Sequence, residues 1–448
     1  MNRIFNRLGP PQLLVLGFAS VIFIGAALLT LPIASETGTA TEFLTALFTA
    51  TSAVCVTGLV VVDTSSHWSV FGETIIMLLI QVGGLGIMTS AALFALLLGK
   101  KIGLKERLIL QESLNKMNIS GVVRLVRQII LITFTMEGIG AIVLFLRFLK
   151  EMPLGKAAFY GIFHSISAFN NAGFDLFGVL TGKFSSLTSF TSDIIVTLTI
   201  SFLFITGGLG FIVIMQLSHT LRFKEWDLHT KTVLSVTAML LGLAFAAVIM
   251  VEWTNPNTLG QLSWGDKILA AFFQSATPRT AGFNTLDTAA LRIPTQFLVI
   301  VLMFIGASPG STGGGIKTTT LATYLSSTKA TLQGKEDTTA FERRIPKELV
   351  SKASAILFVS LSWVILVTFL LSISEQADFL TTLFETTSAF GTVGLSMGLT
   401  TSLSTTGKIL IMLTMFLGRL GPLTLMYSLA KVKTETKIRY PEDNLLIG

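Results

Sequence analysis

Four stretches of this chain repeat one pattern: FTATSAVCVTGL (Phe48–Leu59), FHSISAFNNAGF (Phe163–Phe174), FQSATPRTAGF (Phe273–Phe283) and FETTSAFGTVGL (Phe384–Leu395). Each copy ends on a glycine and one apolar residue, and a phenylalanine lies ten residues before that glycine. The pairs are Phe48 with Gly58, Phe163 with Gly173, Phe272 with Gly282, and Phe384 with Gly394. Four copies of a short loop can close a ring around one axis, and such a ring can hold a dehydrated cation.

The composition around these loops is that of an integral membrane protein. Of the 448 residues, 51% are hydrophobic and only 13% are charged. Eight apolar stretches are long enough to cross about 30 Å of hydrocarbon. They are residues 12–33, 69–98, 123–149, 190–217, 230–253, 295–325, 348–373 and 405–430.

A shorter apolar segment precedes every second span and ends just before a repeat glycine. These segments (41–54, 156–169, 264–277 and 376–390) are too short to span a bilayer and predict re-entrant pore helices. Helices lying in the headgroups are the alternative, but they would not need the shared glycine. We therefore predict an all-α membrane protein with 8 transmembrane helices and 4 re-entrant pore helices around one pseudo-fourfold pore. Its tandem repeats are 1–99, 100–222, 223–335 (with a broken second span) and 336–448, the last including a cytoplasmic C-terminus.

The distribution of charge predicts the orientation in the membrane. With eight spans both termini lie on one side, and the segments on that side hold 23 Lys and Arg residues against 8 on the other. The positive-inside rule then places both termini in the cytoplasm. The inner positive charge fits either lipid contact or a docking surface for a soluble partner.

Other classes of function have little support in the sequence. The single cysteine, Cys55, excludes an internal disulfide and a Cys-based cluster, and the four histidines form no ligand pattern. We find no nucleophile–base pair and no paired catalytic carboxylates. The expectation is a protein that is not an enzyme, with no transition metal, no covalent cofactor and no nucleic-acid partner.

The residues next to the repeat glycines are the candidate ion-binding residues. Extended backbone inside a membrane is tolerated where it lines a wet cavity, and its carbonyls can replace the water around a cation. Four tight turns with glycine caps are the structural alternative. Cys55 is expected near the permeation path, where an external cationic thiol reagent would block flux. The predicted potassium filter consists of Val56, Thr57, Gly58, Asn171, Ala172, Gly173, Thr280, Ala281, Gly282, Thr392, Val393 and Gly394.

In these four loops, and in the segment GASPGSTGGGIKT (Gly306–Thr318), the chain resembles the Trk/Ktr/HKT superfamily of potassium uptake proteins. The resemblance covers nearly the whole chain and is closest to the membrane subunits of bacterial Ktr systems. It implies that one glycine per loop marks potassium selectivity, and Gly58 in the first loop, where a serine is associated with sodium transport, implies potassium. It also implies a homodimer in the bacterial plasma membrane, with one pore per protomer. A KtrA-like cytoplasmic ring would carry the regulatory nucleotide, and some members depend on sodium.

The third repeat carries a predicted gate. Pro309 and five glycines within residues 306–315 cannot form a straight helix, so the span should break at mid-membrane. A packing kink and a phosphate site are the alternatives, and the G-x-x-x-x-G-K pattern of a phosphate loop fails because Ile316 separates Gly315 from Lys317. The resemblance likewise implies a gate beneath the filter. The gate residues are Gly306, Ser308, Pro309, Gly310, Ser311, Thr312, Gly313, Gly314, Gly315, Lys317 and Arg419.

Arg419 lies within the apolar span of the fourth repeat. An arginine inside the membrane is a functional candidate. Below a cation filter it would repel cations or hold the 306–315 loop through its carbonyl oxygens. A structural salt bridge with Glu137 is the alternative.

Two functions compete at this stage. One is a channel-like potassium pore gated by a cytoplasmic partner, and the other is an ion-coupled secondary transporter. The four repeats share one orientation, which favours a pore on one axis. A voltage-gated channel would need a helix with Lys or Arg at every third position, and none is present in the sequence.

Overall fold

The computed structural model describes residues 9–97, 122–429 and 441, and this part of the chain is almost entirely helical. Most of the basic residues of the segments 1–11, 99–127 and 431–448 lie outside the described residues, and so does the boundary between the first two predicted repeats. The one small sheet in the described part pairs β1 (Thr339–Ala340) with β2 (Arg343–Arg344) in antiparallel register.

Four long helices begin the four quarters of the chain. Within the described residues, these four are the unbroken helices that are long and apolar enough to cross a membrane. Large apolar side chains point outward from them, such as Met250 at 81% and Phe358 at 73% exposure, as expected for a surface that faces lipid. The helices are α2 (Pro10–Leu29), α8 (Val122–Phe148), α13 (Leu228–Glu252) and α17 (Lys347–Ser374).

A short helix follows each long one, at the positions predicted for the pore helices. They are α3 (Phe43–Val54), α9 (Leu154–Phe169), α14 (Trp264–Ala276) and α18 (Phe379–Gly391). Phe48, Phe163 and Phe384 are fully buried on their inner faces. In the third copy the fully buried ring is that of Phe273, nine residues before Gly282, whereas Phe272 is half-buried. Phe272 keeps the ten-residue spacing in the sequence, but the buried ring of this copy is one residue nearer to its glycine.

The second span of every quarter is divided into two helices. The pairs are α5 (Val70–Leu85) with α6 (Ile87–Leu97), α11 (Ile194–Leu209) with α12 (Phe211–His219), α15 (Ile293–Phe304) with α16 (Thr318–Leu332), and α19 (Thr405–Leu420) with α20 (Pro422–Leu429). The sequence predicted a break in the third quarter alone, so the expectation of continuous spans over 69–98, 190–217 and 405–430 is wrong. A glycine with φ between 81° and 95° ends the first helix in those three quarters (Gly86, Gly210 and Gly421), and α11 and α12 meet at 100°. A left-handed glycine ends a helix because its backbone turns away from the helical path.

Other glycines let the second spans approach the short helices. A Cβ atom on Gly83, Gly207 or Gly418 would lie 2.0 Å from the carbonyl oxygen of Val54, Phe169 or Phe390, respectively. No side chain fits at that distance, so these glycines pack helix against helix. In the third quarter Gly306 packs instead on the Gly314 carbonyl, 2.1 Å from such a Cβ.

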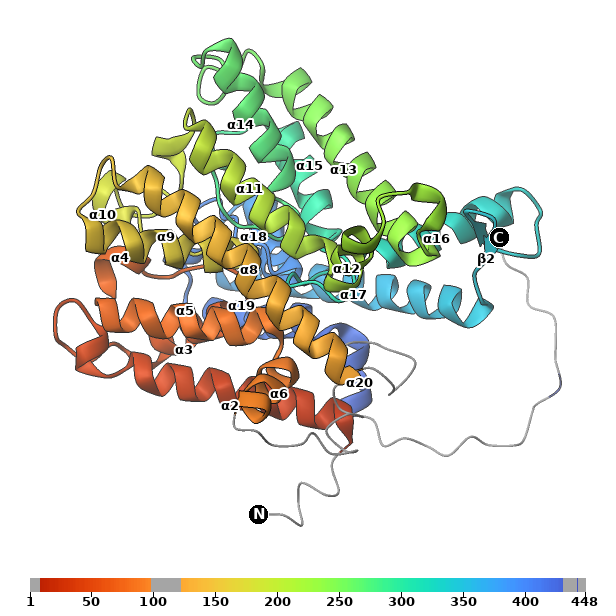
Figure 1. Cartoon of the computed structure of the whole chain (residues 1–448), viewed down its shortest axis with the longest axis horizontal. Helices are drawn as coiled ribbons and strands as arrows, with labels where there is room; N and C mark the ends of the chain where they lie inside the picture. Colours follow the sequence, from red (N-terminus) through yellow and green to blue (C-terminus); the bar gives the residue numbers. More distant parts are fainter. Residues whose placement is uncertain (1–8, 98–121, 430–440, 442–448) are drawn as a thin grey trace.

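The contacts between quarters close on themselves. Helix α5 packs on the short helix α9 of the next quarter, α11 on α14, α15 on α18, and α19 on α3 of the first quarter. Figure 1 accordingly shows the red N-terminal helices α2 and α3 beside the blue C-terminal helices α19 and α20. This cyclic order brings the four loops that follow the short helices to the centre of the molecule.

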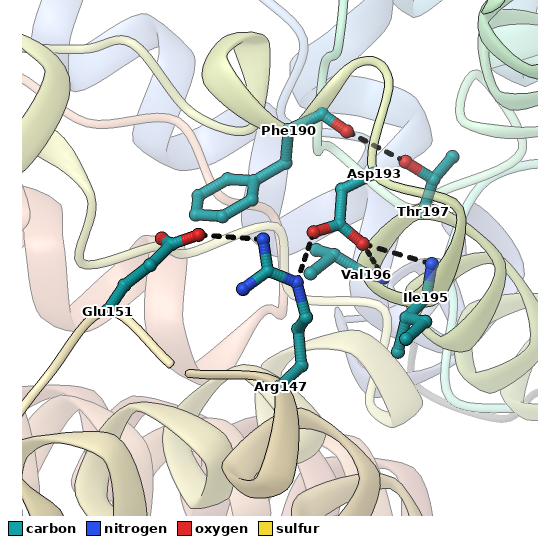
Figure 2. Close-up of polar contacts among 7 residues, drawn as sticks. All are labelled: Arg147, Glu151, Phe190, Asp193, Ile195, Val196 and Thr197. Atoms are coloured by element: carbon teal, nitrogen blue, oxygen red, sulfur yellow. Dashed lines mark hydrogen bonds and ion pairs between the residues drawn. The ribbon is translucent and has the colours of Figure 1, made fainter. Parts of the chain in front are cut away.

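Short elements and one ion-pair cluster connect the helices. Figure 2 shows Arg147, at the end of α8, between Glu151 and Asp193. Asp193 is also the N-cap of α11 and accepts from the Ile195 and Val196 amides, both at 3.0 Å. The cluster therefore fixes the end of α8 against the start of α11.

The remaining short elements are η1 (Pro32–Ala34), α4 (Thr64–His67), α10 (Gly178–Thr181), η2 (Thr188–Phe190), η3 (Phe223–Glu225) and η4 (Thr400–Ser402).

Candidate functional site

The four repeat glycines meet in one ring. A Cβ atom on Gly58 would lie 3.1 Å from the Cα of Gly173, and one on Gly173 would lie 2.9 Å from the Cα of Gly282. A Cβ on Gly282 would lie 3.4 Å from the Cα of Gly394, and one on Gly394 would lie 3.1 Å from the Cα of Gly58. The ring leaves no room for a side chain at these four positions.

The backbone of the four loops repeats along with the sequence. The residue two positions before each glycine has φ between 48° and 62°, and each glycine has φ between 69° and 96°. The residue between them is outside the left-handed region. Two left-handed residues on either side of one that is not left-handed give a backbone that is neither helix nor strand, so all four loops share one irregular conformation. The left-handed residues that are not glycine are Val56, Asn171, Thr280 and Thr392.

Hydroxyl groups from the short helices brace the loops. Ser52 Oγ accepts from the Gly58 amide, and Ser388 Oγ accepts from the Gly394 amide, both at 3.1 Å. Ser167 Oγ instead donates to the Phe174 carbonyl at 2.7 Å. In the third copy Thr277 makes the equivalent bond to the Phe283 carbonyl. These residues were not predicted, although a Ser-Ala pair that recurs in all four loops was a local signal; in the third loop the bracing hydroxyl belongs to Thr277, directly after that pair.

The predicted filter residues are therefore brought together by the fold. Eleven of them are buried and Gly394 is half-buried. Thr57, Ala172, Ala281 and Val393 hold the middle position of their loops, each with an amide bonded back to its own short helix.

The predicted gate residues from Gly306 to Lys317 form a loop between α15 and α16 that lies against the predicted filter loops, whereas Arg419 belongs to α19. Its edge bonds to the end of α11, where the Ser308 amide donates to the Gly208 carbonyl at 3.0 Å and the Thr312 amide to the Gly207 carbonyl at 3.3 Å. Ser311 Oγ closes a turn on the Ser308 carbonyl at 2.6 Å, and the chain reverses through Pro309 and Gly310. The Gly310 carbonyl accepts from the Phe211 amide across the break between α11 and α12. The interruption at Gly210 thus makes room for the loop.

Two basic side chains hold this loop. Lys317 Nζ donates to the carbonyls of Gly313 at 2.7 Å and Gly314 at 3.4 Å. Arg419 donates through Nη1 to the Thr312 carbonyl and through Nη2 to the carbonyls of Gly83 and Gly84. The last two belong to the C-terminal end of α5, where helix carbonyls lack partners within the helix and a cation is stabilised. Arg419 therefore joins the first quarter to the loop of the third.

Glu137 does not pair with Arg419 in the described structure. Its Oε1 accepts from Asn170 Nδ2 at 2.7 Å, and the same nitrogen lies 3.3 Å from Gln81 Oε1. The Glu137 carbonyl also accepts from Ser165 Oγ at 2.6 Å. Glu137 thus supports the second filter loop from behind, a role that the sequence did not reveal.

Cys55 is fully buried and directly precedes Val56 of the predicted filter, so its thiol is closed to an external reagent. It caps the C-terminus of α3 and belongs to the hydrophobic core around Val54 and Phe48.

A cationic thiol reagent is therefore expected to leave Cys55 unmodified in the folded protein and fully modified after denaturation. Mass spectrometry of the single thiol, with flux measured in parallel, checks this. Rapid modification of folded protein with loss of flux would restore the original expectation.

Several known proteins resemble this chain over nearly its full length. The TrkH family model, described as a cation transport protein, matches residues 13–438. Ktr system potassium uptake protein B of Bacillus subtilis (strain 168) is 48% identical over 442 residues, with 99% of this chain and 97% of the relative covered. The protein of the same name from Vibrio alginolyticus is 43% identical, with 98% and 95% covered. Potassium/sodium uptake protein NtpJ of Enterococcus hirae is 40% identical, with 100% and 99% covered.

The fold also matches a solved structure. The potassium transporter TrkH from Vibrio parahaemolyticus aligns with a TM-score of 0.71 at 18% identity, covering 93% of this chain and 83% of that one. This is a family of membrane transporters and not of enzymes. The chain therefore belongs to the TrkH family of cation transport proteins, within the Trk/Ktr superfamily that its loops predict, and is similar over nearly its full length to KtrB.

Proposed function

We propose that this protein mediates potassium uptake through a pore whose filter is the ring of four glycine loops. The observation that carries the proposal is the convergence of Gly58, Gly173, Gly282 and Gly394, each two residues after a left-handed residue. Carbonyls of the twelve filter residues would replace the water around the ion. Potassium is favoured by Gly58 in the first loop and by relatives that are named potassium uptake proteins.

The proposed architecture has eight spans and four re-entrant helices around a pseudo-fourfold axis. The cyclic order of contacts between each second span and the next short helix supports it. In this arrangement the quarters 1–99, 100–222, 223–335 and 336–448 are equivalent repeats, and each divided second span crosses the membrane as a bent pair.

The loop 306–315 is the proposed gate, in its closed position. It lies against the filter residues, and the hydrogen bonds of Lys317 and Arg419 to its carbonyls stabilise it there. A loop with few regular backbone bonds can move at lower cost than a helix, which suits a switch.

Deleting residues 310–313 is expected to raise potassium flux and to reduce its dependence on any cytoplasmic partner. The shortened loop can no longer reach both the end of α11 and the filter. Flux per folded protein in liposomes, with thermal stability as the control, measures this. A folded deletion protein that conducts like wild type would contradict the gate.

The proposed partner is a cytoplasmic, KtrA-like ring of nucleotide-binding subunits. The Ktr system names of the relatives imply more than one component. We further propose a homodimer in the bacterial plasma membrane, surrounded by lipid, with both termini in the cytoplasm.

Flux without a second ion tests this function against an ion-coupled transporter. Purified protein in liposomes with only potassium and an impermeant anion should pass potassium down its gradient. If potassium flux required a sodium or proton gradient, the proposal of a channel-like pore would be wrong. The corresponding structural test is an experimental density map, which should show ion density on the axis through the four glycines.

A further inference from the structure

The side chains at the inner end of the filter contact the gate loop. Thr312 Oγ1 donates to Asn171 Oδ1 at 2.6 Å and lies 3.2 Å from the Phe169 carbonyl of the same quarter. The backbone amide of Gly314 donates to Thr392 Oγ1 at 3.0 Å. Two of the four filter loops therefore bond directly to the gate loop.

A third filter loop packs on the same segment. A Cβ atom on Gly313 would lie 2.1 Å from Thr280 Oγ1, and one on Gly314 would lie 2.4 Å from Thr392 Oγ1. Asn171 Nδ2 is also 3.5 Å from Thr280 Oγ1, which joins the second loop to the third. The fourth member of this ring, Val56, carries no polar side-chain atom.

These three polar residues are the left-handed, non-glycine positions of their loops. Their side chains are fully buried, so bulk water does not replace a hydrogen bond that they lose when the gate loop moves. The gate loop bonds to the side chains of Asn171 and Thr392 and not to their backbone carbonyls.

We infer that Asn171, Thr280 and Thr392 form a second latch, on the filter side of the gate loop, and that their side chains govern gating and not ion selection. This inference rests on the proposed function, since it requires a filter and a gate. It assigns the loop two independent attachments: Arg419 and Lys317 bind its carbonyls, whereas the filter side chains bind the Thr312 hydroxyl and the Gly314 amide. Opening must break both.

The test is a pair of isosteric substitutions, Thr312→Val and Thr392→Val. Thr392→Val removes the acceptor of the Gly314 amide, and Thr312→Val removes the hydroxyl that contacts Asn171 Oδ1 and the Phe169 carbonyl. Both variants keep the β-branched shape. A buried neutral hydrogen bond corresponds to a change of roughly 2- to 12-fold in the closed-to-open ratio, so flux without partner should rise by that factor. The potassium/sodium flux ratio should stay at the wild-type value.

Three companion variants make the result decisive. Thr387→Val is the matched control, since the Thr387 hydroxyl is buried in α18 with no hydrogen-bond partner among the described residues, and it should leave flux unchanged. Thr312→Ser keeps the donor and should restore low flux. Gly58→Ser tests the filter itself and should lower the potassium/sodium flux ratio.

The outcomes separate the inference from the proposed function. Raised flux with an unchanged ion ratio supports the filter-side latch. Unchanged flux in both Val variants overturns it, as does a lower potassium/sodium ratio, which would make these side chains part of ion selection. If Gly58→Ser leaves the ratio unchanged, the proposed filter itself is wrong.

Discussion

Gly58→Ser is expected to lower the potassium/sodium flux ratio on the order of tenfold. The residue has φ of +88°, and a Cβ there would lie 2.5 Å from the Ala172 carbonyl. The left-handed conformation costs a side chain about 1–2 kcal/mol, and the contact forces the loop of the second quarter to move. Since about 1.4 kcal/mol corresponds to a tenfold change in an equilibrium, displaced carbonyls should change ion preference by that order.

Gly398→Ser is the matched control for this variant. Gly398 has φ of +96°, the same as Gly394, but nothing lies within 4 Å of a Cβ placed on it. It therefore carries the backbone strain without the contact in the ring. Ion ratios from paired potassium and sodium flux in liposomes should differ between the two serine variants. An equal effect of both, or no effect of either, would exclude the glycine ring as the filter.

Arg419→Ala is expected to raise potassium flux per folded protein by tenfold or more. The guanidinium holds the Thr312 carbonyl of the gate and the Gly83 carbonyl at the end of α5. Hydrogen bonds to a charged group contribute about 1.5–3 kcal/mol each, so their loss should favour the open loop by at least about tenfold. Loss of the positive charge also removes repulsion of cations below the filter. The requirement for a cytoplasmic partner should fall as well.

Glu137→Ala separates this latch from a structural salt bridge. Glu137 bonds to Asn170 and not to Arg419, so its loss should lower folded yield through the second filter loop without raising flux. If Arg419 were structural, both alanine variants would lose yield in the same way. A fall in flux for Arg419→Ala at normal thermal stability would refute the latch.

Local sequence was sufficient for much of the fold. The apolar stretches that became α2, α8, α13 and α17 and the four short helices are each encoded within about thirty residues, because hydrophobic length and glycine placement act locally. The break between α15 and α16 followed from Pro309 and its neighbouring glycines. The breaks at Gly86, Gly210 and Gly421 were missed, although Pro422 directly after a glycine was a local stop signal. In those spans the continuous hydrophobicity predicted one unbroken helix, and a single glycine was not a strong enough signal to predict the break.

The sequence by itself determined the four repeated loops, the interruption of the second span of the third repeat at residues 306–315, and the family. What only the tertiary structure decided is which side chains meet. Arg419 bonds to residues 107 and 336 positions away, and Thr312 to one 141 positions away. Such pairs depend on how four quarters close around one axis, which no local pattern encodes. For the same reason Cys55 became a core residue and Glu137 a support for Asn170, because burial and partnership are set by the neighbouring quarters and not by the residue's own segment.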